Sequence, residues 1–270
     1  MKRKLGINTD CIRGVVDEVT VLEMAHKLGF TAFTSGNPSM ETVSALRARA
    51  DELGMEFSFL HAPYKGINVL WEADEEAAEL FSQKVKDAID AAAANAVPAV
   101  ILHVSSGWNP PPVCDRGLAR YDALVDYAEE KGVMIAFENL RCIGNLACLV
   151  DRYEFRDNVR FCFDCGHEHC YTKTVSWPDI FTNRLVATHI HDNMSRADDD
   201  KVTDGDTHWL PFDGTYNYHE MMRKLNKYAY EGPLVLEVFR HVRADYKKLT
   251  PEEFLATAYD RIKRISVMGE

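Results

Sequence analysis

The amino-acid sequence predicts a (β/α)8 barrel, and three observations indicate this fold class. Eight short apolar runs have the composition of β-strands, and segments with helical spacing lie between them. The chain has 270 residues, a common length for this barrel as one domain. An open doubly wound sheet also alternates strands and helices, but the first predicted turn, NTDCIRGVV, lacks the glycine-rich pattern of a nucleotide-binding fold. We therefore expect residues 1–270 to form a single barrel domain.

The predicted strands are short runs rich in β-branched and aromatic residues, which favour extended structure. They lie at residues 4–9, 30–35, 55–62, 98–104, 133–139, 159–164, 184–190 and 233–239.

Six segments carry helix signals. Those at 19–29, 39–54, 117–132 and 218–232 each end in glycine, which favours the left-handed conformation that follows many helices. Apolar residues recur at spacings of three and four in residues 74–95. In the last segment, 250–265, Thr250 is a predicted N-cap and Pro251 occupies the first helical position.

Composition limits the possible partners and the expected location. The net charge of −11 disfavours a nucleic-acid partner. Seven cysteines show no disulfide-framework spacing, and neither a signal peptide nor an apolar run near 18 residues is visible. We expect a cytoplasmic protein with reduced thiols and no membrane partner.

Polar residues stand at the carboxyl ends of six consecutive predicted strands. They are His61, His103, Glu138, Asp164, His189 and Glu237. A single such residue is commonly a hydrogen-bonded core histidine or a loop-capping carboxylate. In a barrel, however, the carboxyl ends of the strands line the active site, so six in succession indicate a shared site.

Strand parity predicts what lies beneath these polar residues. Side chains alternate along a strand, so Glu138 shares its face with Ala136 and Met134. The same parity pairs Cys162 with Asp164, Ala187 with His189, and Val235 with Glu237. We expect a layer of small or apolar side chains inside the barrel, capped by a polar layer.

The polar layer predicts a metal site. Three carboxylates and one imidazole in a dry ring cannot all stay ionised without a counter-cation. Oxygen-rich ligation with one imidazole suits Mn²⁺, Mg²⁺, Co²⁺ or Zn²⁺. A further Asp-x-His, DTH at 206–208, follows the strand-end motif HIHDN at 189–193 and supplies additional ligand types.

Four motifs in chain order carry a family resemblance: FENL, FDCGH, HIHDN with DTHW after it, and LVLEVF. Together they resemble the xylose isomerase-like barrel superfamily, which includes sugar isomerases and epimerases similar to D-tagatose 3-epimerase and also endonuclease IV. The resemblance spans nearly the whole chain. It implies a divalent ion held by Glu138, Asp164, His189 and Glu237. His189 is preferred to His191 because the family ligand precedes an acidic residue, here Asp192, by three positions.

Further residues match the ligands with which endonuclease IV holds three zinc ions. By motif these are His61, His103, His167, Asp206 and His208, so the resemblance extends the expectation to more than one ion. The same residues have alternative roles in a sugar enzyme. His167 matches a substrate-contacting histidine of the epimerases, and Asp206 and His208 can orient a ligand or a sugar hydroxyl.

For a ketose or aldose, the resemblance implies proton transfer through a metal-stabilised enediolate, with Glu138 and Glu237 as the catalytic carboxylates. We expect His167 and Arg196 to hold substrate hydroxyls and Trp108 to stack on a sugar face. No glycine-rich phosphate cradle is visible. The sequence thus predicts a metal-dependent sugar isomerase or epimerase acting on a small sugar, with homo-oligomer formation left open.

Two other functions remain open. The first is a multi-zinc phosphodiesterase or abasic-site endonuclease, although FENLRCIGN lacks a glycine-rich polar turn and the acidic segment 196–206 is expected to cover the barrel mouth and repel a duplex. The second is a non-catalytic carbohydrate-binding barrel. A structural zinc in CFDCGHEHC is disfavoured, because strand alternation is expected to point Cys162 into the barrel and Cys165 to the other face.

Overall fold

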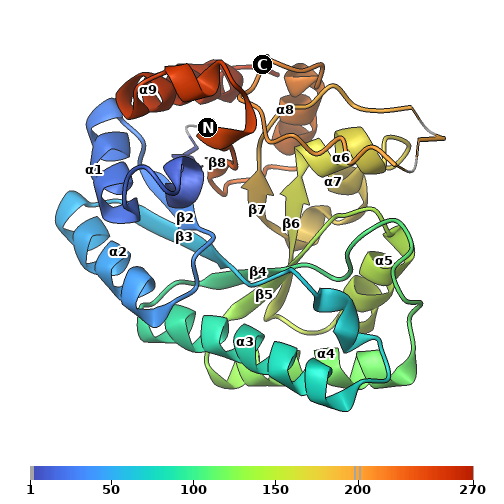
Figure 1. The fold of residues 1–270 in the computed structure, drawn as a ribbon. Helices are drawn as coiled ribbons and strands as arrows, with labels where there is room; N and C mark the ends of the chain where they lie inside the picture. The colour runs from blue at the N-terminus through green and yellow to red at the C-terminus, as the bar shows by residue number, and fades with distance from the viewer. Residues whose placement is uncertain (1–2, 198, 201, 270) are drawn as a thin grey trace.

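A computed structural model describes residues 3–197, 199–200 and 202–269, and these form a (β/α)8 barrel (Figure 1). Eight parallel strands lie in the order β7-β6-β5-β4-β3-β2-β1-β8. A parallel bridge between Ile190 and Leu236 joins the two edges of the sheet. All eight predicted strands are confirmed: β1 (Leu5–Asn8), β2 (Ala32–Ser35), β3 (Glu56–His61), β4 (Ala99–Leu102), β5 (Met134–Glu138), β6 (Val159–Asp164), β7 (Leu185–His189) and β8 (Leu234–Leu236).

The six predicted helices are also present. They are α1 (Glu18–Leu28), α2 (Met40–Leu53), α3 (Glu75–Ala94), α4 (Asp115–Glu130), α8 (Tyr218–Lys227) and α9 (Pro251–Ser266). Gly29 and Gly54 end α1 and α2 at φ values of 107° and 67°, as the glycine signals predicted. Thr250 caps α9 in a reciprocal capping box with Glu253.

The observed helices differ from the predicted ones in one early end and three additional helices. The segment predicted to reach Gly232 stops as a helix at Lys227, because Ala229 adopts a left-handed φ of 52°. Helices α5 (Ile143–Arg152), α6 (Cys165–Tyr171) and α7 (Trp177–Ile180) follow β5 and β6 where no helix was predicted. Cys165 therefore begins a helix, and the strand parity that we assigned to it is wrong.

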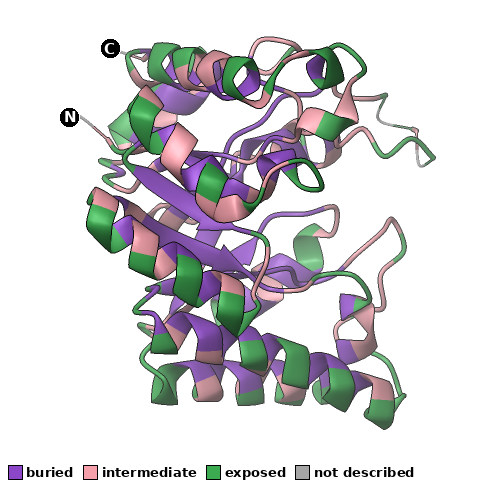
Figure 2. Ribbon diagram, turned by 60° about the vertical axis from the view of Figure 1, so that its left-hand side comes forward, coloured by how far each residue is buried: buried purple, intermediate pink, exposed green. Residues whose placement is uncertain are grey.

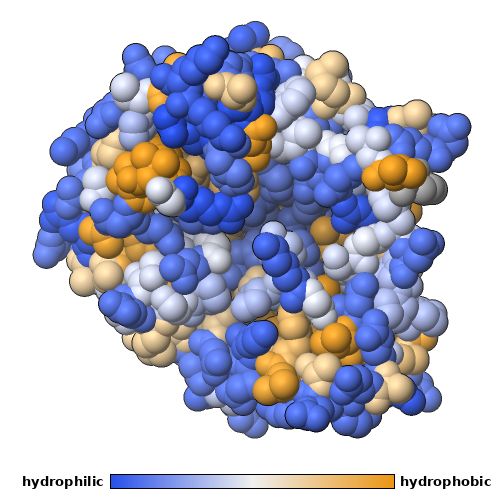
Figure 3. Space-filling model, in the orientation of Figure 1, coloured by the Kyte–Doolittle hydropathy of each residue, from blue (hydrophilic) through white to orange (hydrophobic). Residues whose placement is uncertain are grey.

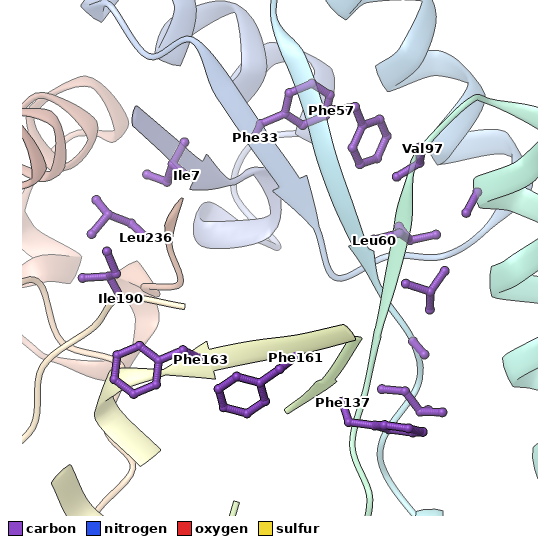
Figure 4. Packing of buried hydrophobic residues seen from close by; sticks show 14 of the residues in the cluster. Ile7, Phe33, Phe57, Leu60, Val97, Phe137, Phe161, Phe163, Ile190 and Leu236 are labelled. Atoms are coloured by element: carbon purple, nitrogen blue, oxygen red, sulfur yellow. The ribbon is translucent and has the colours of Figure 1, made fainter. Parts of the chain in front are cut away.

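The barrel has two apolar layers separated by strand parity. Inside it, small and apolar side chains pack together, and Met134 packs against them: Phe59, Ala99, Ile101, Ala136, Cys162, Ala187 and Val235. This confirms the filler layer predicted beneath the polar strand ends. Alternate side chains such as Phe33, Phe57, Phe137 and Phe161 surround the strands on the outside (Figure 4), where the helices bury one face and expose the other (Figure 2).

Within the described residues, no helix combines the length and apolar character that crossing a membrane requires. All seven cysteines are free thiols.

Candidate metal centre

The polar strand ends converge in three adjoining clusters at the barrel mouth. In each cluster one nitrogen or oxygen atom of every member lies within 4.8 Å of those of the others. The first cluster is His61, His103 and Glu138; the second is Glu138, Asp164, His189 and Glu237; the third is His167, His191, Asp206 and His208. Glu138 belongs to two clusters, so the first and second sites adjoin through one carboxylate.

Glu138 ends β5 and is completely buried. Its Oε2 lies 3.0 Å from Nε2 of His103 and 3.3 Å from Nε2 of His61. Its Oε1 lies 3.0 Å from Nδ1 of His189 and 3.4 Å from Nδ1 of His167. Both carboxylate oxygens thus face imidazoles that come from separate parts of the barrel mouth, an arrangement suited to a shared ligand.

The second cluster is built around Asp164, the last residue of β6 and the N-cap of α6. Its Oδ1 accepts the backbone N–H of His167 at 2.6 Å, which turns the chain from strand to helix directly above the site. The side chain of Asn139 exchanges two hydrogen bonds of 2.8 Å with the Asp164 backbone. Nδ1 of His189 lies 3.8 Å from Oδ2 of Asp164 and 3.4 Å from Oε2 of Glu237.

The third cluster depends on a contact made far along the chain. Asp192 and Trp209 form an antiparallel bridge, and the Asp192 carboxylate also accepts the backbone N–H groups of Phe212 and Tyr216. This bridge folds the DTH segment back beside β7. His208 takes a left-handed φ of 46° there, a conformation that is costly for a residue with a side chain.

Pairing between carboxylates and imidazoles lowers the pKa of Glu138 and raises the pKa of His208. Burial acts to raise the pKa of Glu138, but the charges of His189 and His103 outweigh it and hold the pKa well below its usual range. Burial opposes the charged form of His208, yet Asp206 raises its pKa to about 10. Without an ion, protons on imidazoles thus balance the carboxylates, and an ion would displace those protons.

A cavity of about 750 Å³ opens over the clusters, and Figure 3 shows a hydrophilic hollow in the middle of this face. The cluster members that line it are His61, His103, His167, His189, Asp206, His208 and Glu237. Its charged rim is mixed and contains Arg13, Lys65, Lys84 and Arg141 together with Asp10 and Asp204. Arg13 lies 3.9 Å from Asp10 and Arg141 pairs with Asp204, which leaves Lys65 and Lys84 as the basic rim residues outside these two pairs. Residues 198 and 201 of the predicted acidic loop lie outside the described residues.

Two predicted substrate contacts are not among the described residues that line the cavity. The guanidinium carbon of Arg196 lies 3.7 Å from the centre of a Trp108 ring, and Arg196 Nε donates to the carbonyl oxygen of Cys170 at 2.6 Å. Arg196 and Trp108 therefore stack on each other beside the site, and their predicted roles remain untested.

Sequence reasoning overlooked three residues of the site. His191 was set aside in favour of His189, but the structure uses both in different clusters. Asn139 in FENL and Asp192 in HIHDN hold the backbone around the site. Their position directly beside predicted ligands was the available signal.

Residues 22–264 match the family described as xylose isomerase-like TIM barrel, and the chain belongs to this family. An uncharacterized protein, y4fM, of Sinorhizobium fredii is 32% identical over 201 residues, covering 66% of this chain and 62% of that protein. The uncharacterized protein MJ1311 of Methanocaldococcus jannaschii is 23% identical over 194 residues, covering 66% and 63%. The chain thus matches less than two thirds of the length of either relative.

Solved structures share the fold at low identity. D-psicose 3-epimerase from Clostridium cellulolyticum, solved with D-tagatose, has a TM-score of 0.76 at 17% identity and covers 100% of both chains. The 3-keto-D-glucoside 4-epimerase YcjR of E. coli has a TM-score of 0.73 at 14% identity, covering 98% of this chain and 99% of that one. A xylose isomerase domain protein of Planctomyces limnophilus has a TM-score of 0.71 at 16% identity, covering 98% and 96%.

Proposed function

We propose that this member of the xylose isomerase-like TIM barrel family is a metal-dependent sugar isomerase or epimerase. The second cluster, buried at the floor of an open polar cavity, carries this proposal. The names of two similar structures, D-psicose 3-epimerase and 3-keto-D-glucoside 4-epimerase, support the same reaction class. A mixed-charge rim also suits a neutral polyhydroxylated ligand better than a polyanion.

The donor set of the second cluster fits a divalent cation. Its three carboxylates and one imidazole are buried or nearly so, and Glu138 and Glu237 act against each other's ionisation. Oxygen-rich ligation of this kind suits Mn²⁺, Mg²⁺, Co²⁺ or Zn²⁺. When bound, such an ion polarises a sugar carbonyl and stabilises negative charge on its oxygen. The neighbouring clusters are proposed to hold further ions.

The two glutamates have different surroundings, which divides their proposed roles. Glu237 lines the cavity and its side chain is 15% exposed, so it can reach a substrate carbon and move a proton. Glu138 is buried beneath and faces four imidazoles, which makes it chiefly a ligand. We therefore assign the first proton transfer to Glu237; Glu138 keeps its predicted role of returning the proton in an epimerase, which requires a substrate carbon to approach this buried carboxylate. His167 lines the cavity, but its Nδ1 faces the carbonyl oxygen of Asn139, so the predicted contact of Nε2 with a substrate hydroxyl is an alternative to its binding an ion in the third cluster.

Hydrogen exchange tests this function directly. Protein loaded with Mn²⁺ or Zn²⁺ is incubated in deuterated water with a panel of ketoses and aldoses. We expect deuterium at the carbon next to the carbonyl of some sugar, and no exchange with Glu237→Gln. Glu231→Gln is the matched control, because Glu231 is exposed near the opposite end of β8. Exchange that survives in Glu237→Gln would refute the assignment of the base.

The three adjoining clusters specifically favour a second candidate, hydrolysis of a phosphoester, because multinuclear sites commonly catalyse that reaction. Two of the four basic rim residues, Arg13 and Arg141, are paired with carboxylates, which weakens the rim as a binding surface for a duplex backbone. We expect no incision of abasic-site DNA. Efficient incision with no exchange in any sugar would replace the isomerase proposal. A protein that holds no ion after careful purification, and that gains neither activity when metal is added, would favour a carbohydrate-binding barrel. A cytoplasmic location and homo-oligomer formation stay predictions of the sequence.

A further inference from the structure

We propose that the third cluster is a closed zinc site in which His191 is the fourth ligand. Its members are His167, His191, Asp206 and His208. In this assignment the ion holds the loop after β7 against α6 and does not bind substrate. The inference does not depend on which reaction the protein catalyses.

Two of the histidines are oriented by backbone carbonyls. Nδ1 of His167 lies 2.9 Å from the carbonyl oxygen of Asn139, and Nδ1 of His208 lies 3.0 Å from that of Glu237. A carbonyl can only accept, so each Nδ1 carries a hydrogen, and Nε2 is the nitrogen that can bind an ion once the ion displaces its proton. Both Nε2 atoms approach Oδ2 of Asp206, at 3.0 and 3.1 Å. Three donor atoms therefore already point at a common position.

His191 is the fourth member of this arrangement. It is completely buried, its ring stacks on that of His208 with centroids 4.1 Å apart, and its Nε2 lies 3.6 Å from Oδ1 of Asp206. That Oδ1 is buried and has no hydrogen-bond partner among the described residues, and the same is true of Nδ1 of His191. An unpartnered carboxylate oxygen this deep is costly, and a cation beside it would remove the cost.

The chain makes room for the His191 ring at one position. Gly166, in the first turn of α6, has no side chain, and a Cβ there would lie 1.9 Å from Cε1 of His191. Gly166 is also anchored, because its carbonyl oxygen accepts from the side chain of Asn193. A glycine inside a helix is otherwise unfavourable, so its presence here matches the space that the imidazole needs.

The donor set decides the ion and its role. Three imidazoles and one carboxylate suit Zn²⁺, whereas the carboxylate-rich second cluster suits a harder ion such as Mn²⁺. Four protein ligands fill a tetrahedral site, and filled sites are structural whereas catalytic zinc sites keep an open position. The third ion therefore has no free position for a substrate phosphate.

An alternative role for His191 must be separated by experiment. Its Nε2 also lies 3.1 and 3.2 Å from the two oxygens of Asp164, so it could instead position that ligand of the second cluster. The two roles predict the loss of different ions, and Asp206→Asn marks the third site independently of Asp164.

The experiment measures metal content and Co²⁺ absorption of the full-length protein. Wild type, His191→Asn and Gly166→Ala are compared. His169→Asn is the matched control, because His169 lies on α6 with Gly166 but its side chain contacts Thr215 outside the third cluster. We expect His191→Asn and Gly166→Ala each to lose one zinc equivalent, or to bind it more weakly by on the order of 100-fold. They should also lose one tetrahedral Co²⁺ signal, while His169→Asn matches wild type.

Double variants decide between the two roles. Adding His191→Asn to Asp206→Asn should remove no further ion, since both changes act on the same site. Loss of a second ion in that double variant would show that His191 acts through Asp164 and would overturn the proposal. Full zinc content and an unchanged Co²⁺ spectrum in both His191→Asn and Gly166→Ala would overturn it as well.

Discussion

Glu138 belongs to two clusters, and Glu138→Gln should therefore cost the protein more metal than any other single change at the site. Glutamine keeps the size of the buried side chain but removes the charge that faces His61, His103 and His189. We expect Glu138→Gln to lose the ions of the first and second clusters, and Asp206→Asn to lose only that of the third.

The expected size of the effect follows from this count. At a free ion concentration a hundredfold above its dissociation constant, each ion stabilises the fold by about 2.7 kcal/mol. Glu138→Gln removes two such contributions, about 5.4 kcal/mol, and Asp206→Asn removes one. An unfolding entropy of about 2.1 cal/mol/K per residue gives roughly 0.57 kcal/mol/K for 270 residues. The metal-dependent rise in Tm should thus shrink by about 10 °C in Glu138→Gln and about 5 °C in Asp206→Asn.

The assay combines elemental analysis with thermal unfolding of each variant, loaded and after verified chelation. The difference within one variant cancels any effect of the substitution on the ion-free fold. Glu231→Gln is the control and should keep the full metal content and the full rise in Tm. Equal metal loss in Glu138→Gln and Asp206→Asn would refute the bridging role of Glu138, and undiminished metal in Glu138→Gln would refute the site itself.

Three further predictions follow from individual contacts. Asp164→Asn should lose metal and activity yet stay folded, because asparagine can still cap α6; undiminished metal by elemental analysis would contradict the ligand assignment. In ion-free protein the raised pKa of His208, about 10 against a usual 6.5, should contribute stability fully below about pH 6.5 and lose it as the pH rises through 10. Urea midpoints should therefore fall more steeply over that range in wild type than in His208→Asn, and equal slopes would refute the pairing with Asp206. Gly117→Ala should destabilise the fold by about 1–3 kcal/mol, because its Cβ would lie 2.0 Å from Cε3 of Trp71; Gly144→Ala, with nothing within 4 Å, is the control and should be neutral or stabilising in the same denaturation assay.

Local sequence signals predicted the fold because a barrel repeats the same strand and helix units, and each unit leaves a pattern in its own stretch of sequence. Strand parity placed Ala136, Cys162, Ala187 and Val235 inside the barrel, since every second side chain of a strand shares a face. Capping residues such as Thr250 marked a helix start because a side-chain oxygen next to the first turn satisfies a free N–H. The two helices after β6 escaped prediction because α6 and α7 are short, with seven and four residues, too few for a periodic pattern to stand out.

The sequence by itself determined which strand ends carry ligand-type side chains, and tertiary structure alone decided how they divide into clusters. His189 and His191 have the same parity, yet the bridge between Asp192 and Trp209 brings the DTH segment to His191 and leaves His189 with Glu138. Arg196 lies in a loop, where no strand or helix periodicity predicts which way its side chain points. Its stacking on Trp108 depends on where two separate loops meet. A strand's alternation is a property of its own backbone, whereas the position of a loop is set by contacts with residues far away in the chain.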